Sequence, residues 1–359
     1  MIKNIVFILL FFPLIKCTNP SLQERGGFIV NDMLGREVMV PEEINRIIGL
    51  RAGALRLLVY MDAAGLIAGV EEIERDATKP YLMAYPELTC LPSVGPLMGG
   101  DPELILNVNP DVIFISYTTK GDADALQKKT GIPVIAIECP EFATGKDRLF
   151  DSFKLIGRVL QKENRADSLI SYIKRSIGML HNLSDDIPEN QRPTVYIGGV
   201  NYSGSFGINS TQPFYPPYIF TNSRNVASGI NERLISHVKG TFVDKEQLLL
   251  WNPDYIFIDQ SGYTNVRQDM GKNSVLYNGL DAVQGNKIFA LYPYNNYAIN
   301  YEMVLANAWY VGKVLYPERF QDVIIESKTD EILEAFLGKI AGMELISKHF
   351  RQIDKNELQ

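Results

Sequence analysis

Short, largely apolar segments alternate with amphipathic segments in the first part of the chain. Segments 45–50 (NRIIGL), 66–70 (LIAGV), 111–116 (DVIFIS) and 133–138 (PVIAIE) have the length of buried strands, and stretches with helical spacing of apolar residues separate them. Strands of this kind are typical of a parallel sheet covered by helices on both faces. The preceding segment 26–41, GGFIVNDMLGREVMVP, predicts a β-hairpin.

A long amphipathic stretch without proline interrupts this alternation. Residues 145–184 predict one continuous α-helix, and a polar linker follows it. Strands and helices then alternate again, beginning at TVYIGG (194–199). The expected fold is therefore α/β, with two doubly wound, Rossmann-like lobes at 28–144 and 192–359 that are linked by a single long α-helix.

One octapeptide occurs twice, as NPDVIFIS at 109–116 and as NPDYIFID at 252–259. Both copies follow an apolar helical run. The residue before each proline is biased away from helical backbone, so the helix is expected to end there. The apolar residues that follow predict a central strand. The repeat therefore predicts that the two lobes are built alike.

The amino terminus resembles a secretory signal. MIKNIVFILLFFPLIKC carries Lys3 and then eleven apolar residues from Ile5 to Ile15, too few to span a bilayer, which needs about 20. Cys17 stands where a bacterial lipoprotein is lipidated, although Lys16 departs from the small residues usual at that place. We expect residues 1–17 to be a signal peptide or lipoprotein signal. The protein is therefore expected in the periplasm or at the cell surface. Cleavage without lipidation is the alternative.

Charge and metal-binding residue types narrow the function. Without residues 1–16, which contain two lysines, the chain has 33 basic and 42 acidic residues, a net charge of −9. Such an acidic chain argues against a nucleic-acid partner. The three histidines are scattered, whereas a bare zinc or manganese ion favours clustered histidines and carboxylates, so no metal site is expected. Cys90 and Cys139 are either two free thiols or a disulfide.

Several segments, taken in order, resemble the substrate-binding proteins of iron-chelate and cobalamin ABC importers. The resemblance covers roughly residues 28 to 340 and is carried by PEEINRIIGL, LPSVGPLMGGDPELILNVNPDVIFIS, KEQLLLWNPDYIFID and NKIFALYPYNNYAINYEMVLANAWYVGKVLYPERF. It implies two lobes that close only slightly on a ligand between them. It also implies a permease dimer with a cytoplasmic ATPase as partner and no intrinsic cofactor.

The resemblance gives the repeat a functional meaning. Family members carry one glutamate on each lobe that pairs with arginines of the permease. Glu103 and Glu246 match these positions, and each lies seven residues before the proline of its repeat. Two carboxylates on equivalent surfaces suit a twofold partner. For one glutamate taken alone, a solvated residue in the first turn of a helix is the favoured interpretation. The identical offsets of the two glutamates favour docking.

Ligands of open α/β sheets bind beyond the carboxyl ends of the strands. Tyrosine suits such a place, because its ring buries area and its hydroxyl stays polar. The ligand-binding residues that we expect there are Arg51, Tyr85, Tyr117, Tyr202, Tyr263, Tyr294, Asn296 and Tyr297. Arginine and tyrosine favour a metal chelate, first a ferric siderophore and then haem or a corrinoid.

Doubly wound folds are often enzymes, so that class needs separate consideration. The chain has no G-x-G-x-x-G fingerprint, no P-loop and no G-x-S-x-G elbow. The acidic pair Glu71-Glu72 follows a predicted strand, but such pairs are common on solvated surfaces. We therefore expect no catalytic residues. An extracytoplasmic enzyme or a metallocluster-holding protein on a similar two-lobed frame remains the alternative from another class.

Overall fold

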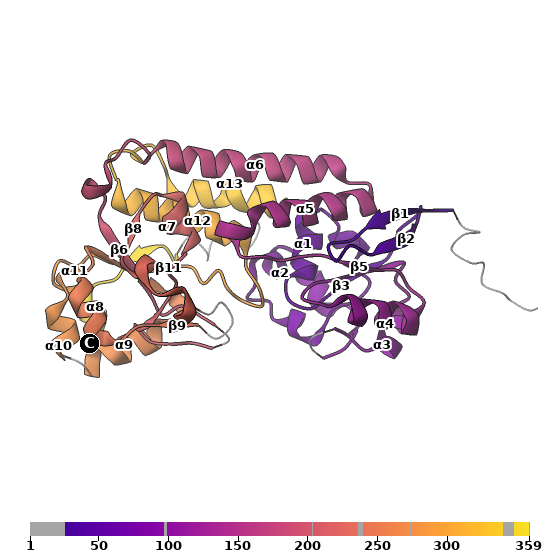
Figure 1. Cartoon of the computed structure of the whole chain (residues 1–359), viewed down its shortest axis with the longest axis horizontal. Coiled ribbons are helices and arrows are strands. Elements are labelled where there is room, and N and C mark those ends of the chain that lie inside the picture. The colour runs from indigo at the N-terminus through magenta and orange to yellow at the C-terminus, as the bar shows by residue number, and fades with distance from the viewer. Residues whose placement is uncertain are drawn as a thin grey trace, which may run out of the picture.

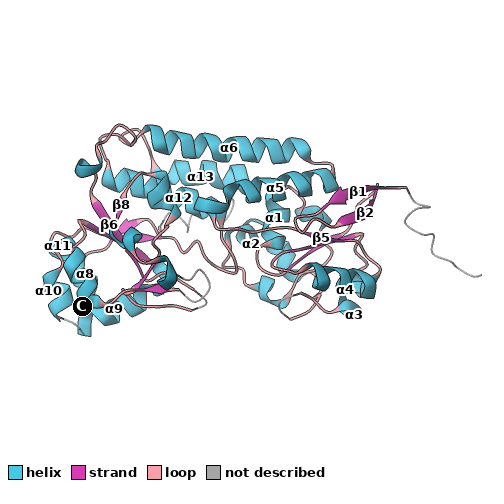
Figure 2. Cartoon of the chain, in the orientation of Figure 1, coloured by secondary structure: helices cyan, strands magenta, loops and turns pink. Residues whose placement is uncertain are grey.

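The chain folds into two α/β lobes beneath a layer of long helices (Figure 1; Figure 2). The computed structural model describes residues 26–96, 99–202, 204–235, 240–272, 274–339 and 348–358. The expected signal, including Cys17, lies outside these described residues.

The amino-terminal lobe is built on three parallel strands in the order β3-β4-β5, with the hairpin β1-β2 beside them. Every residue of the three parallel strands is buried, as expected for a sheet covered on both faces. The elements of this lobe are β1 (Gly27–Asn31), β2 (Glu37–Pro41), β3 (Ile47–Leu50), β4 (Val112–Ile115), β5 (Val134–Ala136), α1 (Ala54–Tyr60), α2 (Pro80–Ala84), α3 (Pro102–Val108) and α4 (Lys120–Thr130).

The carboxyl-terminal lobe contains a five-stranded sheet in the order β12-β11-β10-β6-β8, in which only β12 is antiparallel to its neighbour. Its elements are β6 (Thr194–Gly198), β7 (Ser210–Thr211), β8 (Arg224–Asn225), β9 (Thr241–Phe242), β10 (Tyr255–Asp259), β11 (Ile288–Leu291), β12 (Arg351–Gln352), α7 (Pro216–Phe220), α8 (Lys245–Trp251), α9 (Tyr263–Lys272), α10 (Ser274–Gly279), α11 (Asp281–Gln284), α12 (Tyr301–Leu315) and α13 (Ile325–Leu337). The predicted fold class is confirmed.

The repeated octapeptide forms the same structure in both lobes. Asn109 and Asn252 end α3 and α8 in the left-handed region, with φ of 43° and 39°, which asparagine tolerates better than most residues. The aspartate after each proline then bonds to the neighbouring strand. Asp111 accepts from two backbone N–H groups just before β3, and Asp254 accepts from the N–H of Thr194, the first residue of β6, at 2.7 Å. The repeat is therefore a device that ends a helix and sets the start of the adjacent parallel strand.

The prediction of one continuous helix over 145–184 is wrong. The chain instead forms α5 (Phe142–Leu160) and α6 (Glu163–Asn182), which pack against each other. Gln161 turns the chain with a φ of 55°. Gly157 permits the close approach, because a Cβ atom there would lie 3.2 Å from the Cβ of Ala166 in α6.

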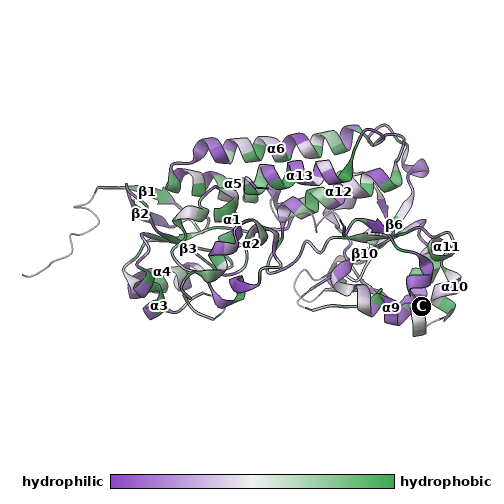
Figure 3. Cartoon of the chain, turned by 180° about the vertical axis from the view of Figure 1, so that it is seen from behind, coloured by the Kyte–Doolittle hydropathy of each residue, from purple (hydrophilic) through white to green (hydrophobic). Residues whose placement is uncertain are grey.

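Of these two helices, α6 is the one that links the lobes (Figure 1). Its 20 residues span about 30 Å. In the carboxyl-terminal lobe it packs on α12 and α13, where Trp309 Nε1 donates to Ser176 Oγ at 3.0 Å. Hydrophobic and hydrophilic residues alternate along α6, as expected for a helix that buries one face (Figure 3).

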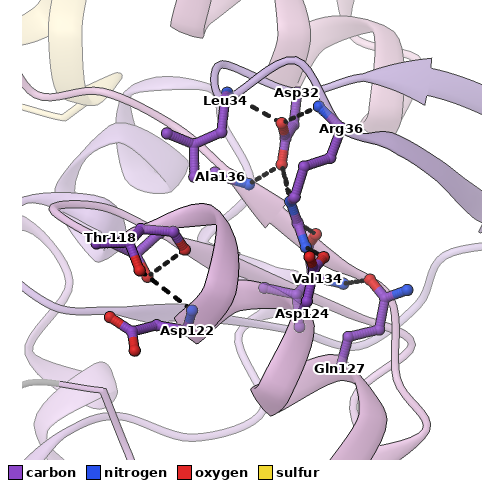
Figure 4. A network of polar contacts seen from close by, with 10 residues as sticks. Asp32, Leu34, Arg36, Thr118, Asp122, Asp124, Gln127, Val134 and Ala136 are labelled. Carbon is purple, nitrogen blue, oxygen red and sulfur yellow. Dashed lines mark hydrogen bonds and ion pairs between the residues drawn. The ribbon is translucent and has the colours of Figure 1, made fainter.

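The β1-β2 turn is fixed against the end of β5 by a buried ion pair (Figure 4). Arg36 Nε donates to Asp32 Oδ2 at 2.8 Å, and the same oxygen accepts from the Ala136 N–H at 3.2 Å. Arg36 also pairs with Asp124 of α4 at 2.9 Å. In addition, the Met33 N–H donates to the carbonyl oxygen of Ala136 at 3.1 Å. The turn therefore lies beside the carboxyl ends of the amino-terminal strands.

The last residue of β10 is a buried carboxylate. Asp259 is 2% exposed and accepts hydrogen bonds from the N–H and hydroxyl of Ser261. Burial raises the pKa of Asp259 to about 6, although the bonds from Ser261 oppose the rise. Its ionisation therefore opposes folding, because the unfolded chain loses this proton near pH 4 and the folded chain holds it to higher pH.

We predict that Asp259→Asn makes folding less dependent on pH. In the wild type, the free energy of unfolding falls as pH rises from about 4 through about 6, because the buried Asp259 must ionise. The side-chain amide of the variant does not titrate. Relative to the wild type, the variant should gain up to about 3 kcal/mol between pH 4 and pH 7 in urea unfolding. Asp322→Asn, in an exposed loop, is the matched control. A constant difference across this pH range would contradict the prediction.

Candidate functional site

The amino-terminal lobe has a topological switch point between β3 and β4. β3 pairs with β4 on one side, and Ile47 of β3 forms a parallel bridge with Ile67 on the other. Ligands of doubly wound sheets bind beyond the carboxyl ends of the strands at such a point. Arg51 follows β3 and Tyr117 lies two residues beyond β4. The Arg51 guanidinium donates through Nη1 to the carbonyl oxygen of Tyr117, so two of the expected ligand residues meet there.

The segment after β11 carries residues of the carboxyl-terminal lobe to this switch point. We call residues 292–300 the crossing segment. Arg56 of α1 donates to the carbonyl oxygens of Asn296 at 2.8 Å and Ile299 at 2.9 Å. At the other end of the contact, the Tyr301 hydroxyl donates to the carbonyl oxygen of Pro140, beyond β5, at 2.7 Å. The crossing segment therefore contacts α1 of the other lobe, and Tyr301, which directly follows the segment, contacts the loop beyond β5.

Glu71 joins the switch point to the crossing segment. It is fully buried, and its carboxylate accepts from the Arg51 N–H at 2.7 Å, the Gly99 N–H at 2.9 Å and the Tyr297 hydroxyl at 3.2 Å. The expectation that the Glu71-Glu72 pair is solvated is wrong for Glu71. Its place directly after the apolar run 66–70, at the ligand-binding edge of a doubly wound sheet, was the available signal.

Backbone strain is concentrated at the same place. Among the described residues, ten other than glycine have positive φ; six of these are asparagine, aspartate or glutamine. The remaining four are Arg51, Tyr117, Tyr297 and Ala298, with φ of 67°, 43°, 48° and 70°. Large side chains rarely adopt this conformation, and such residues tend to cluster at functional sites. Three of the four are residues that the sequence predicted as ligand contacts.

The structure brings together only part of the predicted set. Arg51, Tyr117, Asn296 and Tyr297 lie at the switch point and the crossing segment. Tyr294 also belongs to the crossing segment, but its hydroxyl donates to the side chain of Gln212.

The other three predicted tyrosines also bond within the protein. The Tyr202 hydroxyl donates to the carbonyl oxygen of Thr211 at 2.7 Å. Tyr85 donates to the carbonyl oxygen of Leu337, at the end of α13, at 2.8 Å, and thus lies at a helix contact between the lobes. Tyr263 faces Glu357 near the carboxyl terminus, with 3.4 Å between the oxygen atoms.

The groups at the switch point differ in what they offer a ligand. The buried Nε of Arg51 has no hydrogen-bond partner among the described residues, so this cation has donor capacity left. Burial raises the pKa of Tyr117 to about 12, and its hydroxyl donates to the carbonyl oxygen of Cys139 at 2.7 Å. A mostly apolar hollow of about 240 Å³ lies beside Tyr117, between Leu34 of the hairpin turn and Pro140.

Metal, thiol and membrane chemistry can be assessed over the described residues. These contain no group of three His, Cys, Asp or Glu side chains placed to hold a metal ion. Cys90 and Cys139 are both free thiols, one exposed and one buried, so the disulfide alternative is not realised. Burial raises the pKa of the Cys139 thiol to about 12, which keeps it protonated. Within the described ranges, no helix combines the length and hydropathy that a bilayer crossing requires.

Comparisons with known proteins agree with this architecture. The molybdate-binding protein MolA of Haemophilus influenzae is 25% identical over 329 residues, which are 86% of this chain and 90% of that protein. Its molybdate-bound structure superposes with a TM-score of 0.66 at 24% identity, covering 87% of this chain and 98% of the other. A periplasmic solute-binding protein from Veillonella parvula gives a TM-score of 0.71 at 21% identity over 92% and 99% of the two chains.

A family model described as periplasmic binding protein matches residues 50–294, more than half of the chain. This match confirms the family that the sequence motifs indicated. Its relatives are substrate-binding proteins of ABC transporters, so the enzyme alternative is not supported. The chain therefore belongs to the periplasmic binding protein family, and it is a solute-binding protein of an ABC importer rather than an enzyme.

Proposed function

We propose that this receptor captures a small metal-containing anion at the switch point of the amino-terminal lobe. The observation that carries the proposal is Arg51, a half-buried cation whose Nε has no hydrogen-bond partner among the described residues. A guanidinium binds oxyanions well, because its N–H groups form a rigid fork and its charge persists at any physiological pH. The similarity to a molybdate-binding protein supports a tetrahedral metal oxyanion as the ligand.

The hydroxyl groups of the predicted tyrosines favour a small ligand over a large one. Those of Tyr85, Tyr117, Tyr202, Tyr294 and Tyr297 all donate to acceptors within the protein. A bulky chelate that relied on them would first have to break these bonds. An oxyanion needs only a few donors close to one cation, and Arg51 can supply the first of them.

A ferric siderophore is the second candidate, with haem and corrinoids as further members of the same class. The mostly apolar hollow beside Tyr117 favours it, because an organic chelator has carbon surface to bury. Arg51 would serve this ligand as well, since ferric siderophores are often anionic. The two candidates therefore share the cation and differ in whether the hollow is used.

We predict that replacing Arg51 weakens binding of the anion. Arg51→Lys keeps a positive charge but loses the planar fork, so it should lower molybdate affinity by about tenfold or more in calorimetric titration of the purified protein. Arg175→Ala, an exposed arginine on α6, is the control and should bind like the wild type. If the protein binds a ferric tris-catecholate and does not bind molybdate, the oxyanion proposal is wrong and the siderophore becomes the preferred ligand.

For delivery, we propose that Glu103 and Glu246 dock on the permease dimer, as the family resemblance implies. Both are exposed and lie in the first turn of a seven-residue helix, α3 and α8. Each helix ends at the left-handed asparagine of its repeat, so the two glutamates occupy equivalent places in the two lobes. Attachment of lipid at Cys17 would keep the receptor close to this partner and its cytoplasmic ATPase.

We predict that charge reversal separates delivery from binding. Glu103→Arg and Glu246→Arg should each reduce ligand uptake through the reconstituted importer, and the double variant should reduce it further. Ligand affinity should stay within about twofold of the wild type, because neither residue lies at the switch point. Glu163→Arg, an exposed glutamate in the first turn of α6, is the matched control. Normal uptake by the double variant would refute the docking role.

A further inference from the structure

Glu71 has surroundings unlike those of an ordinary surface carboxylate. It is fully buried, and no ion pair to a basic side chain is formed by it among the described residues. Instead, Oε2 accepts from the Arg51 N–H and the Tyr297 hydroxyl, and Oε1 accepts from the Gly99 N–H. Three neutral donors therefore compensate one buried negative charge. Losing any of these hydrogen bonds would leave the buried carboxylate less well compensated, at a cost in free energy.

The three donors come from segments that are distant in the sequence. Arg51 follows β3, Gly99 precedes α3, and Tyr297 belongs to the crossing segment. Arg51 and Tyr297 both have left-handed backbone, with φ of 67° and 48°. Bulky residues keep this conformation only where their surroundings impose it. The Glu71 carboxylate is a direct bonding partner of both.

Gly99 extends the same arrangement to the Arg51 side chain. Its φ of 125° is open to glycine and strained for other residues, and a Cβ atom there would lie 3.3 Å from Arg51 Nε. The hydrogen bond from the Gly99 N–H to Glu71 therefore keeps a residue without a side chain next to the Arg51 guanidinium. One oxygen of Glu71 thus binds the backbone of Arg51, and the other binds the backbone of Gly99, which lies beside Arg51 Nε.

We propose that Glu71 is the positioning residue of the binding site: it holds Arg51 in its left-handed conformation and couples it to the crossing segment through Tyr297. This inference rests on the proposed function, in which Arg51 contacts the anion. A guanidinium that is already ordered loses less conformational entropy when the ligand binds. Glu71 itself does not contact the ligand, so its effect on affinity is indirect.

The experiment compares Glu71→Gln with Glu72→Gln. The first variant keeps the size of the side chain but turns one acceptor oxygen into a donor that faces an N–H or O–H group. The second removes the same charge from the adjacent exposed residue, which pairs with Arg75 at 3.0 Å. Residue-resolved amide hydrogen exchange and molybdate titration are both measured well below the unfolding temperature. Tyr297→Phe, which removes a single hydroxyl, serves as the second variant if Glu71→Gln fails to fold.

In Glu71→Gln, exchange at the amides of Arg51 and Gly99 should accelerate by about tenfold or more, since a bond to a charged acceptor is lost. Molybdate affinity should fall by a similar factor, and Glu72→Gln should change neither. Tyr297→Phe should leave the Gly99 amide protected and still weaken binding several-fold.

Two results would overturn the inference: unchanged protection of both amides, or lost protection with wild-type affinity, which would make Glu71 merely structural. If the wild-type protein binds no molybdate, the proposed oxyanion function fails by itself. The siderophore candidate is then titrated as a ferric tris-catecholate with the same variants. The exchange measurement, which needs no ligand, still decides whether Glu71 holds Arg51.

Discussion

The path of the chain between the two lobes depends on one buried cation, Arg56. Its guanidinium is fully buried, lies 4.8 Å from the ring centre of Tyr81, and donates to the carbonyl oxygens of Asn296 and Ile299. Burial by itself lowers the pKa of Arg56, but the acidic groups around it, Tyr81 and Glu302 among them, outweigh burial and raise it above its ordinary value. The charge is therefore permanent, and removing it would leave two partly buried carbonyl groups without their donors.

Because Arg56 binds main-chain carbonyls, it fixes the path of the crossing segment irrespective of the side chains there. That path sets the left-handed backbone of Tyr297 and Ala298 and brings the Tyr297 hydroxyl to Glu71. Contacts elsewhere hold the lobes in the same orientation. Arg165 of α6 donates to the carbonyl oxygen of Tyr60, at the end of α1, at 2.7 Å, and to those of Ala335 and Phe336, at the end of α13, at 2.8 and 2.9 Å. The lobes are thus joined by polar contacts at two separate places, which favours a site that is largely formed before the ligand arrives.

Much of the fold could be predicted from local sequence. The buried strands are short apolar runs, and the repeated octapeptide encodes its own structure: a left-handed asparagine, a proline and a strand-capping aspartate in immediate succession. The break between α5 and α6 could not be predicted in this way. It depends on the close approach of Gly157 to Ala166 and on a hydrogen bond from Gln161 Nε2 to the carbonyl oxygen of Glu42, 119 residues away, at 3.0 Å. Helical periodicity carries no information about either contact.

The residues of the candidate site also differ in whether local sequence could identify them or whether only contacts with distant segments could. Arg51 and Tyr117 were found because the carboxyl end of a strand can be read from the sequence. Tyr85 and Tyr263 follow the same rule but are bonded to Leu337 and Glu357, partners that no local pattern reveals. Glu71 is the reverse case, a residue of the site that the sequence did not indicate. An acid beside a second acid looks solvated, and only the folded chain places three donors around it.

An anionic ligand is compatible with an acidic chain, because charge acts locally in salt solution. The net charge of −7 is spread over the whole chain, and exposed charges more than about 8–10 Å away are largely screened at physiological ionic strength. At the switch point, the carboxylate bonded to the Arg51 backbone is that of Glu71, and its oxygens are already occupied by hydrogen-bond donors. A carboxylate compensated in this way competes weakly for the Arg51 guanidinium. Under the proposed function, the donor capacity left on the Arg51 guanidinium then serves the anion, whatever the sign of the total charge.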